Sequence, residues 1–344
     1  HVRGRRQRQR CISDRPDTDR NRRRLVRFIA QEVRNEMNKN SGKSIPHFDI
    51  EATGLILKEA QRRSGRRGKL SLRLRELGGL VRIAGDLAAE EKAAMTRSEH
   101  VTRARMIAKP LEQQVADRYL ERQSEYSMLV NRGERIGRVN GLAVLGADTG
   151  LSDYSGVVLP VEAMVTPTHG RSGKVIATGG LSDLAQESVT NISAVVKKLT
   201  GKDIQDYDLH VQFPGTHNVD GDSASITMAT AIISAFEGIP IEQNLAMTGS
   251  LTVRGEVLPI GGVSAKIEAA VKSGIEKVII PRSNLQDVLI DEKYEAKVEI
   301  LPVDSLDEVL QHALVGAEDK VSIVERLASV IDTFSGGPDS QPSA

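Results

Sequence analysis

Apolar positions in the first third of the chain follow the period of a helix. Through residues 19–109 they recur every three or four positions, which is the spacing of a helix with one buried face. The pattern marks four segments, at residues 25–33, 55–60, 72–84 and from about Ser98 onward. Short connections marked by glycine and proline separate them. We therefore predict a small all-α unit made of four helices.

Beyond Gly137 the pattern changes to short β-type runs that alternate with helices. Strand-like runs lie at residues 141–145, 157–165, 208–213 and 277–281, and a hairpin turns at residues 254–255. Helical periods return at residues 184–199, 223–236 and 263–273, and Gly274 is placed to end the last of them. The predicted fold class is α+β, with an α/β-like domain preceded by the small all-α unit.

These changes of pattern divide the chain into five parts. They are a basic, disordered segment at residues 1–18, the helical unit at 19–110, a linker or helix at 111–136, the α/β-like domain at 137–316, and a terminal helix with a disordered tail at 317–344. The tail is predicted to be disordered because its end is rich in Gly, Pro and Ser.

Composition narrows the class of protein. Hydrophobic residues make up 39% of the 344 residues, enough for two ordinary cores, but aromatics at 3% and the lack of Trp require aliphatic packing. The net charge of +1 argues against a nucleic-acid surface over the whole chain. Ten arginines nevertheless fall within the first 24 residues, a run that suits either a solvated tail or a phosphate-binding arm.

The sequence also indicates a cellular compartment. Cys11 is the only cysteine, so the chain can form no disulfide framework or thiol metal site, and a reducing, cytoplasmic compartment fits. No apolar stretch approaches the ~20 residues that span a bilayer, and no signal peptide is recognised. Because the sequence starts with His rather than Met, we expect that it comes from a longer protein.

Ser223 is the first candidate for chemistry. It lies in the sequence DGDSAS at residues 220–225, between a predicted strand and a predicted helix. Asp222 or Ser223 suits a helix-capping role. Alternatively, Ser223 is a nucleophile at a helix start, where free N–H groups and the positive end of the helix dipole stabilise an oxyanion. The local sequence leaves both interpretations open.

Lys266 is the candidate base. It lies among small and apolar residues in a predicted helix, where a lysine that faces solvent is only surface charge. A lysine that faces inward loses its water, which lowers its pKa from about 10.4 towards neutrality. The neutral amine can then take the proton of a serine hydroxyl.

Two other peptidase chemistries have less support. His210 and His217 precede Ser223 and would allow a Ser-His-Asp triad, but a single histidine on a strand is usually structural. No His-Glu-x-x-His sequence occurs, so nothing indicates a zinc peptidase, and we predict no metal site.

The segments around both candidates resemble the Lon peptidase domain. They are DGDSAS at residues 220–225, MTGSLTVRGEVLPIGG at residues 247–262, and the lysine that follows the serine by 43 residues. The similarity extends from about Gly137 to Leu310. Asp before the serine resembles the archaeal, B-type branch of the family, whereas the bacterial branch has Pro there. The resemblance implies a serine endopeptidase with Ser223 as nucleophile and Lys266 as general base.

The same resemblance implies roles for four further residues. Thr248 corresponds to the family threonine that hydrogen-bonds the catalytic lysine. Asp220 and Asp222 match acidic residues near the dyad in archaeal-type domains, and Glu162 matches an acidic position of the active site. A carboxylate beside a lysine favours the charged form, so these three would regulate or gate the site. The alternative is that they are helix caps and surface ion pairs.

The helical unit resembles the small α-helical lid of the family's AAA+ ATPase. Residues 21–33 and 72–84 carry this similarity, and Arg73 falls at the sensor-2 position, which reaches nucleotide phosphates. A P-loop is not recognised, because SGKS at residues 41–44 lacks the upstream glycine of that motif. We therefore expect no cofactor and no ATP turnover in this chain, although the full-length family member uses ATP and Mg.

The resemblance also implies substrates and assembly. Unfolded or damaged protein chains are the expected substrates, and the full-length protein would be a homo-oligomer, a hexamer, anchored to the cytoplasmic membrane by a segment that this chain lacks. The rival hypothesis is a catalytically silent Lon-like scaffold that binds unfolded chains, or DNA through its basic arm. Intact Ser223, Lys266 and Thr248 favour the peptidase.

Overall fold

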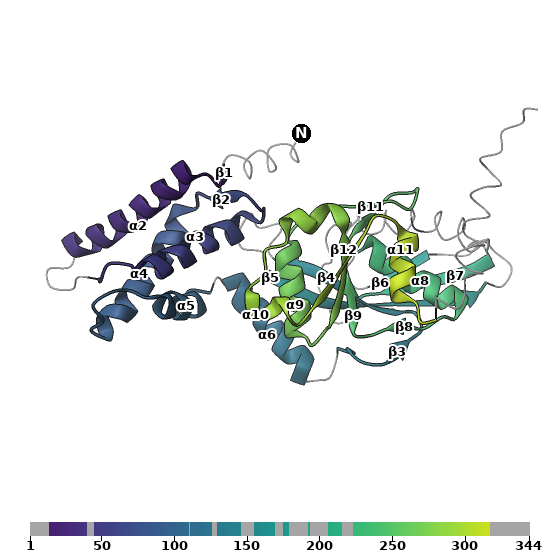
Figure 1. Ribbon diagram of the computed structural model, residues 1–344. Helices are drawn as coiled ribbons and strands as arrows, with labels where there is room; N and C mark the ends of the chain where they lie inside the picture. The colour runs from purple at the N-terminus through teal and green to yellow at the C-terminus, as the bar shows by residue number, and fades with distance from the viewer. Residues whose placement is uncertain are drawn as a thin grey trace, which may run out of the picture. The chain divides into compact units, whose positions relative to one another are not determined.

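The chain folds into two compact units. A computed structural model describes residues 14–39, 45–109, 111–125, 129–145, 155–168, 175–178, 192, 206–214 and 223–316 (Figure 1). The first unit consists mainly of the chain up to Val115, and the second of most of the chain from Ala116 onward. The predicted fold class is confirmed, because a helical unit precedes a domain of mixed helices and strands.

Four helices carry the core in the described part of the first unit, as predicted. They are α2 (Asp19–Lys39), α3 (Ile50–Ser64), α4 (Leu74–Glu90) and α5 (Ser98–Ile107). Their buried stripes meet in one cluster that includes Ile29, Val33, Ile56, Leu80 and Val101. Because each stripe has the helical period, the sequence pattern was sufficient to find these helices.

The first unit also contains a two-stranded sheet that the pattern did not predict. β1 (Asp14–Pro16) pairs antiparallel with β2 (Lys69–Ser71). The end of the segment predicted to be disordered is therefore ordered, and α4 begins at Leu74 rather than at Leu72. Strands of three residues that pair across a long stretch of chain leave no periodic signal.

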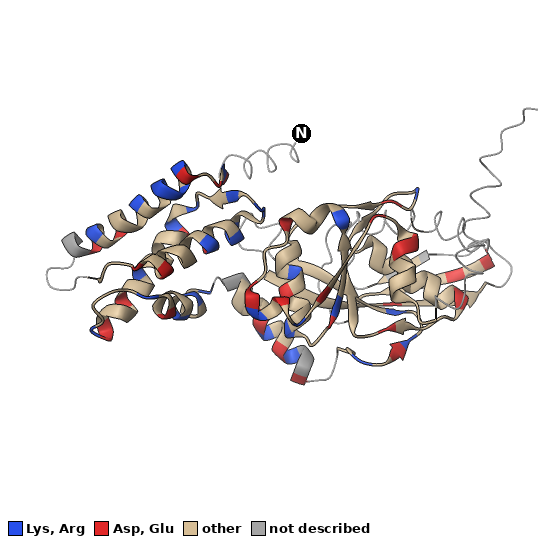
Figure 2. Cartoon of the chain, viewed as in Figure 1, with Lys and Arg blue, Asp and Glu red and all other residues tan. Residues whose placement is uncertain are grey.

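Arginines at the end of the arginine-rich run of the first 24 residues lie on the exposed face of α2, followed by Arg27. Figure 2 shows Lys and Arg along this helix, and Arg20, Arg23, Arg24 and Arg27 are exposed. Arg22 instead pairs with Asp17 at 2.6 Å. The arginines of α2 therefore lie in water on an ordered helix whose opposite face is packed.

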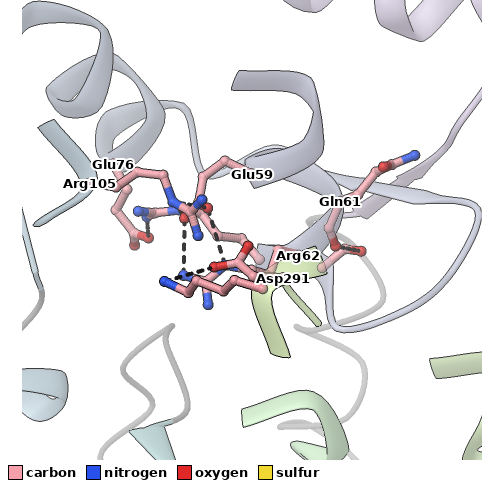
Figure 3. Close-up of polar contacts among 9 residues, drawn as sticks. Glu59, Gln61, Arg62, Glu76, Arg105 and Asp291 are labelled. Carbon is pink, nitrogen blue, oxygen red and sulfur yellow. Dashed lines mark hydrogen bonds and ion pairs between the residues drawn. The ribbon is translucent and has the colours of Figure 1, made fainter. Parts of the chain in front are cut away.

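A buried carboxylate joins the helices of the first unit. Glu59 of α3 is 3% exposed and pairs with the Nε atoms of Arg62 at 3.1 Å, Arg63 at 2.8 Å and Arg105 at 3.2 Å (Figure 3). Arg63 also contacts Glu76 of α4 at 2.8 Å. Burial raises the pKa of Glu59, but the positive charges of the three arginines outweigh burial and hold this pKa below its ordinary value.

A mixed sheet forms the centre of the second unit. In the described residues its strands follow the order β13 (Glu299–Val303), β12 (Lys277–Pro281), β9 (Leu245–Met247), β4 (Arg138–Leu145), β5 (Ser155–Pro167), β7 (Tyr207–Gln212) and β6 (Val175–Thr178). β4 and β5 are antiparallel, as are β5 and β7, and the remaining neighbours are parallel. The strands predicted at residues 141–145, 157–165, 208–213 and 277–281 are β4, β5, β7 and β12.

Two helices cover opposite faces of this sheet. A Cβ on Gly141 of β4 would meet Thr227 of α8 (Ser225–Glu237), whereas a Cβ on Gly156 of β5 would meet Ala265 of α9 (Val263–Lys272). Gly156 pairs with Val144, three residues from Gly141 on the same strand. Because side chains alternate along a strand, the two glycines point to opposite faces. α8 and α9 are also visible on the two sides of β4 in Figure 1.

Smaller elements complete the described part of the chain. They are α6 (Leu111–Glu125), β3 (Glu134–Arg135), β8 (Ile241–Glu242), β10 (Ser250–Leu251), β11 (Val257–Leu258), the short 3-10 helix η2 (Arg282–Asp287), α10 (Glu292–Glu295) and α11 (Leu306–Ala313). β10 and β11 form the predicted hairpin. The predicted helix at residues 184–199 and the predicted tail at 317–344 lie outside the described residues, apart from Ile192.

No helix in the described residues combines the length and the apolar character that a bilayer crossing requires.

We expect the buried charge cluster to stabilise the first unit. Glu59→Gln removes the charge that three arginines share, and breaking a buried ion pair by removing one partner costs about 3–5 kcal/mol. Amide hydrogen exchange in α3 and α5 should accelerate accordingly. Glu90→Gln, at the exposed end of α4, is the control and should change exchange in α3 and α5 little. Equal exchange rates in the two variants would contradict this prediction.

The contribution of Glu59 should also depend on pH. Because its pKa is lowered in the folded state, its stabilisation is present above the ordinary glutamate value of about 4.3 and is lost as pH falls through the lower folded value. The difference in exchange between wild type and Glu59→Gln should therefore shrink as the pH is lowered below about 4.

Candidate active site

Lys266 lies in the first turn of α9. Gly262 occupies the N-cap with φ of 71°, a left-handed conformation that favours glycine. The backbone N–H of Lys266 donates to the carbonyl of Gly262 at 3.1 Å. The lysine is only 1% exposed. Of the two interpretations of this residue, the structure shows the inward-facing one.

Thr248 contacts the buried amine. The distance from Lys266 Nζ to Thr248 Oγ1 is 2.9 Å. Thr248 follows β9 and is itself buried, and its N–H donates to the carbonyl of Ile279 in β12 at 3.1 Å. Its hydroxyl donates to the carbonyl oxygen of Ser223 at 3.2 Å. Because a threonine hydroxyl has one hydrogen, Oγ1 is the acceptor of its bond with the amine.

The backbone of Ser223 is held by the same segment. The N–H of Gly249 donates to the Ser223 carbonyl at 2.9 Å, and the N–H of Ile226 donates to the Gly249 carbonyl at 3.3 Å. A Cβ on Gly249 would lie 3.0 Å from Cδ1 of Ile226 and 3.1 Å from Cγ1 of Val257. The residues after β9 therefore contact both Ser223 and Lys266, which lie far apart in the sequence.

Ser223 lies just before helix α8. The N-cap position is Ala224, which makes no side-chain cap hydrogen bond. The predicted alternative, that Ser223 is the helix cap, is therefore wrong, because the helix begins one residue later than that role requires. Asp222, the other predicted cap, lies outside the described residues. The positive end of the α8 dipole is at this end of the helix.

A glycine of the sheet, Gly156, allows α9 to approach strand β5 closely. A Cβ on Gly156 would lie 2.0 Å from the carbonyl oxygen of Ala265 and 3.0 Å from Cβ of Ala269. Ala265 immediately precedes Lys266. Sequence reasoning missed Gly156, although glycine inside a strand is a recognised signal of close backbone approach. It also missed the close contacts of Gly249, which lies between β9 and β10.

The other predicted residues are placed elsewhere or lie outside the described residues. Glu162 is on β5, where its carboxylate pairs with Arg138 of β4 at 2.8 Å. Asp220 lies outside the described residues, as does His217. His210 is exposed on β7, opposite Met164 of β5. The structure therefore brings together Ser223, Thr248 and Lys266.

Arg73 lies in the first unit, immediately before α4. It occupies the N-cap position and makes no side-chain cap bond. Its Nη1 atom is buried and has no hydrogen-bond partner within the part of the chain that the structure describes. A buried guanidinium nitrogen without a partner is compatible with an external acceptor such as a phosphate.

Comparisons with known proteins cover nearly all of the described chain. Residues 112–316 match the family described as the Lon protease (S16) C-terminal proteolytic domain, and residues 47–106 match the archaeal LonB AAA+ ATPase LID domain. Proteins named archaeal Lon protease are similar to this chain. That of Thermoplasma acidophilum is 54% identical over 318 residues, which are 92% of this chain and 48% of the relative.

Two further proteins named archaeal Lon protease are also similar to this chain. The protein of Archaeoglobus fulgidus is 53% identical over 313 residues, covering 90% of this chain and 48% of the relative. The protein of Methanocaldococcus jannaschii is 32% identical over 329 residues, covering 84% of this chain and 48% of the relative. The chain spans about half the length of these relatives.

We expect that a single methyl group at position 156 disturbs the packing of α9 against β5. Gly156→Ala would place Cβ against the Ala265 carbonyl, and overpacking of this kind costs about 1–3 kcal/mol. Urea unfolding followed by tyrosine fluorescence measures the loss in the second unit. Gly261→Ala is the control, because its Cβ meets no atom within 4 Å. Equal stability of the two variants would show that α9 does not depend on this close approach.

Proposed function

Because the chain belongs to the Lon protease family and carries its C-terminal proteolytic domain, we propose that it is a serine endopeptidase in which Ser223 is the nucleophile and Lys266 the general base. The observation that carries this proposal is the buried amine of Lys266, 2.9 Å from a threonine that also bonds the backbone of Ser223. Lysine is seldom fully buried, and buried ionisable groups are concentrated at functional sites. The burial of Lys266 therefore supports a catalytic role.

Burial supports the role of base. Removing an amine from water disfavours its charged ammonium form. The neutral amine has two hydrogens and one lone pair, and the bond to Thr248 uses one hydrogen. The lone pair is the group that would accept the proton of the Ser223 hydroxyl.

The reaction then follows acyl transfer through an ester. Ser223 Oγ attacks the peptide carbonyl as Lys266 takes the hydroxyl proton, and the ammonium returns this proton to the leaving amine. Water hydrolyses the acyl-enzyme ester with Lys266 again as base, which restores both side chains. The N–H groups and dipole at the start of α8 would stabilise the oxyanion in each step.

ATP dependence, substrates and assembly are proposed for the longer protein. Archaeal Lon proteases are about twice as long as the part that matches this chain. We propose that an ATP-driven motor delivers unfolded or damaged protein chains to this domain, in a cytoplasmic homo-oligomer that is a hexamer. Arg73 would contact the phosphates of the nucleotide. Hydrolysis of this nucleotide would supply the energy for unfolding the substrate and would take no part in peptide cleavage. Asp220, Asp222 and Glu162 would regulate the site.

The rival hypothesis of a silent scaffold has less support. A binding domain that has lost its chemistry has no reason to keep a lysine out of water, because burial of its charge is costly. Lys266 is nevertheless among the largest fully buried side chains of the described residues.

Replacement of either candidate should abolish peptide cleavage without unfolding the domain. Ser223→Ala removes the nucleophile and Lys266→Met removes the base at similar volume, so hydrolysis of unfolded casein should fall by about 10³-fold or more. Lys272→Met is the matched control, because this lysine is on the same helix but bonds Asp117 on the surface. Retained cleavage in the Ser223 or Lys266 variant would refute the dyad.

Thr248 should act through the amine rather than on the substrate. Thr248→Val removes the acceptor of Lys266 Nζ at nearly constant volume, and we expect kcat to fall by about 10- to 100-fold with little change in KM. Thr248→Ser keeps the hydroxyl and should restore most of kcat. A serine variant as weak as the valine variant would show that the methyl group matters, not the hydrogen bond.

A further inference from the structure

Asn284 is a buried amide that bonds one backbone residue twice. It lies in η2 and is 2% exposed. Its Oδ1 accepts from the N–H of Ile260 at 2.8 Å, and its Nδ2 donates to the carbonyl of Ile260 at 3.0 Å. The side chain thereby satisfies both polar groups of this residue, as a neighbouring strand would.

Ile260 belongs to the segment that leads into α9. Gly261 and Gly262 follow it, and Lys266 is in the first turn of the helix. Two successive glycines give the backbone wide conformational freedom. A contact that fixes the backbone directly before these glycines therefore helps to determine where the helix begins. The two hydrogen bonds between Asn284 and Ile260 are such a contact.

The segment that contains Asn284 also makes a hydrogen bond with the backbone of Thr248. η2 directly follows β12, and Ile279 of β12 accepts from the N–H of Thr248 at 3.1 Å. One short stretch, residues 279–284, therefore contacts Thr248, which is the acceptor of the lysine amine, and Ile260, which precedes the N-cap of the helix that carries this amine. These two contacts connect Thr248 to the segment that leads into α9.

We propose that Asn284 is a positioning residue for the peptidase reaction, which fixes the start of α9 so that the amine of Lys266 stays within hydrogen-bonding distance of Thr248. This inference rests on the proposed function of Lys266 as base. Asn284 itself does not contact the reacting atoms in this role. A displacement of the base by about 1 Å is enough to slow such a reaction by about 100-fold.

The alternative is that Asn284 contributes only stability, and a matched residue separates the two. Ser234, in the last turn of α8, is also buried and also makes one donor and one acceptor bond to backbone: it donates to the Ile239 carbonyl and accepts from the N–H of Gly137 at 3.0 Å. Its contacts do not involve α9 or Thr248. Ser234→Ala therefore removes a comparable pair of bonds that involve neither α9 nor Thr248.

The experiment compares Asn284→Ala and Ser234→Ala in the 344-residue chain. Cleavage of a fluorogenic peptide is measured well below the unfolding temperature of each variant. We expect kcat to fall by about 10- to 100-fold in Asn284→Ala with KM nearly unchanged, and by less than about twofold in Ser234→Ala. The acidic limb of the kcat profile should move to higher pH in Asn284→Ala, because a loosened amine regains water. Equal kcat and equal profiles at similar stability would overturn the proposal.

A second readout does not depend on peptide cleavage. The NMR signal of Lys266 Cε, assigned by its loss in Lys266→Met, should titrate at higher pH in Asn284→Ala and as in wild type in Ser234→Ala. If wild type shows no cleavage that depends on Ser223, the proposed function fails, and this titration still decides whether Asn284 positions the lysine. If Asn284→Ala does not fold, Asn284→Ser, which is shorter but polar, is judged by the same two measurements, and unchanged values refute the proposal.

Discussion

The geometry of the candidate site is built around one buried amine and its hydrogen bond to Thr248. A lysine placed in a core loses its hydration, which is favourable only if a partner is in place or the charge is given up. Thr248 is that partner for Lys266, and its remaining hydrogen goes to the backbone of Ser223. The threonine is therefore the point at which two distant segments are held together.

Close backbone approach makes this contact possible. Lys266, on the helix that covers one face of the sheet, contacts Thr248 at the end of β9, and Thr248 bonds Ser223 just before the helix on the other face. These contacts form only if the layers are near. Gly156 admits α9 against β5, and Gly249 admits the residues after β9 against α8. A methyl group at either position would occupy space that a neighbouring segment fills, so packing and chemistry share the same requirement.

The first unit relies on charge in a different way. Glu59 is buried, but three arginines around it make ionisation favourable, and these arginines come from α3 and α5. Such a cluster fixes how α3 and α5 are oriented relative to each other, and it adds little buried apolar area. A small unit has a limited apolar core, so these directional contacts complement its packing. Its carboxylate is satisfied within the unit, whereas Arg73 keeps a buried nitrogen without a partner among the described residues.

The sequence by itself predicted the helices and most of the strands, because periodicity is a local property. Ser223, Lys266 and Thr248 became candidates through the resemblance of their short motifs to the Lon peptidase domain. It did not determine whether Lys266 faces the core, since small residues around a lysine are compatible with either face. It also left out the β1–β2 pairing, the close approaches at Gly156 and Gly249, and the two hydrogen bonds of Asn284, which reach across 24 positions of the chain. Only the tertiary structure decided these features, because burial and non-local hydrogen bonds depend on which segments pack together, and that information is not periodic.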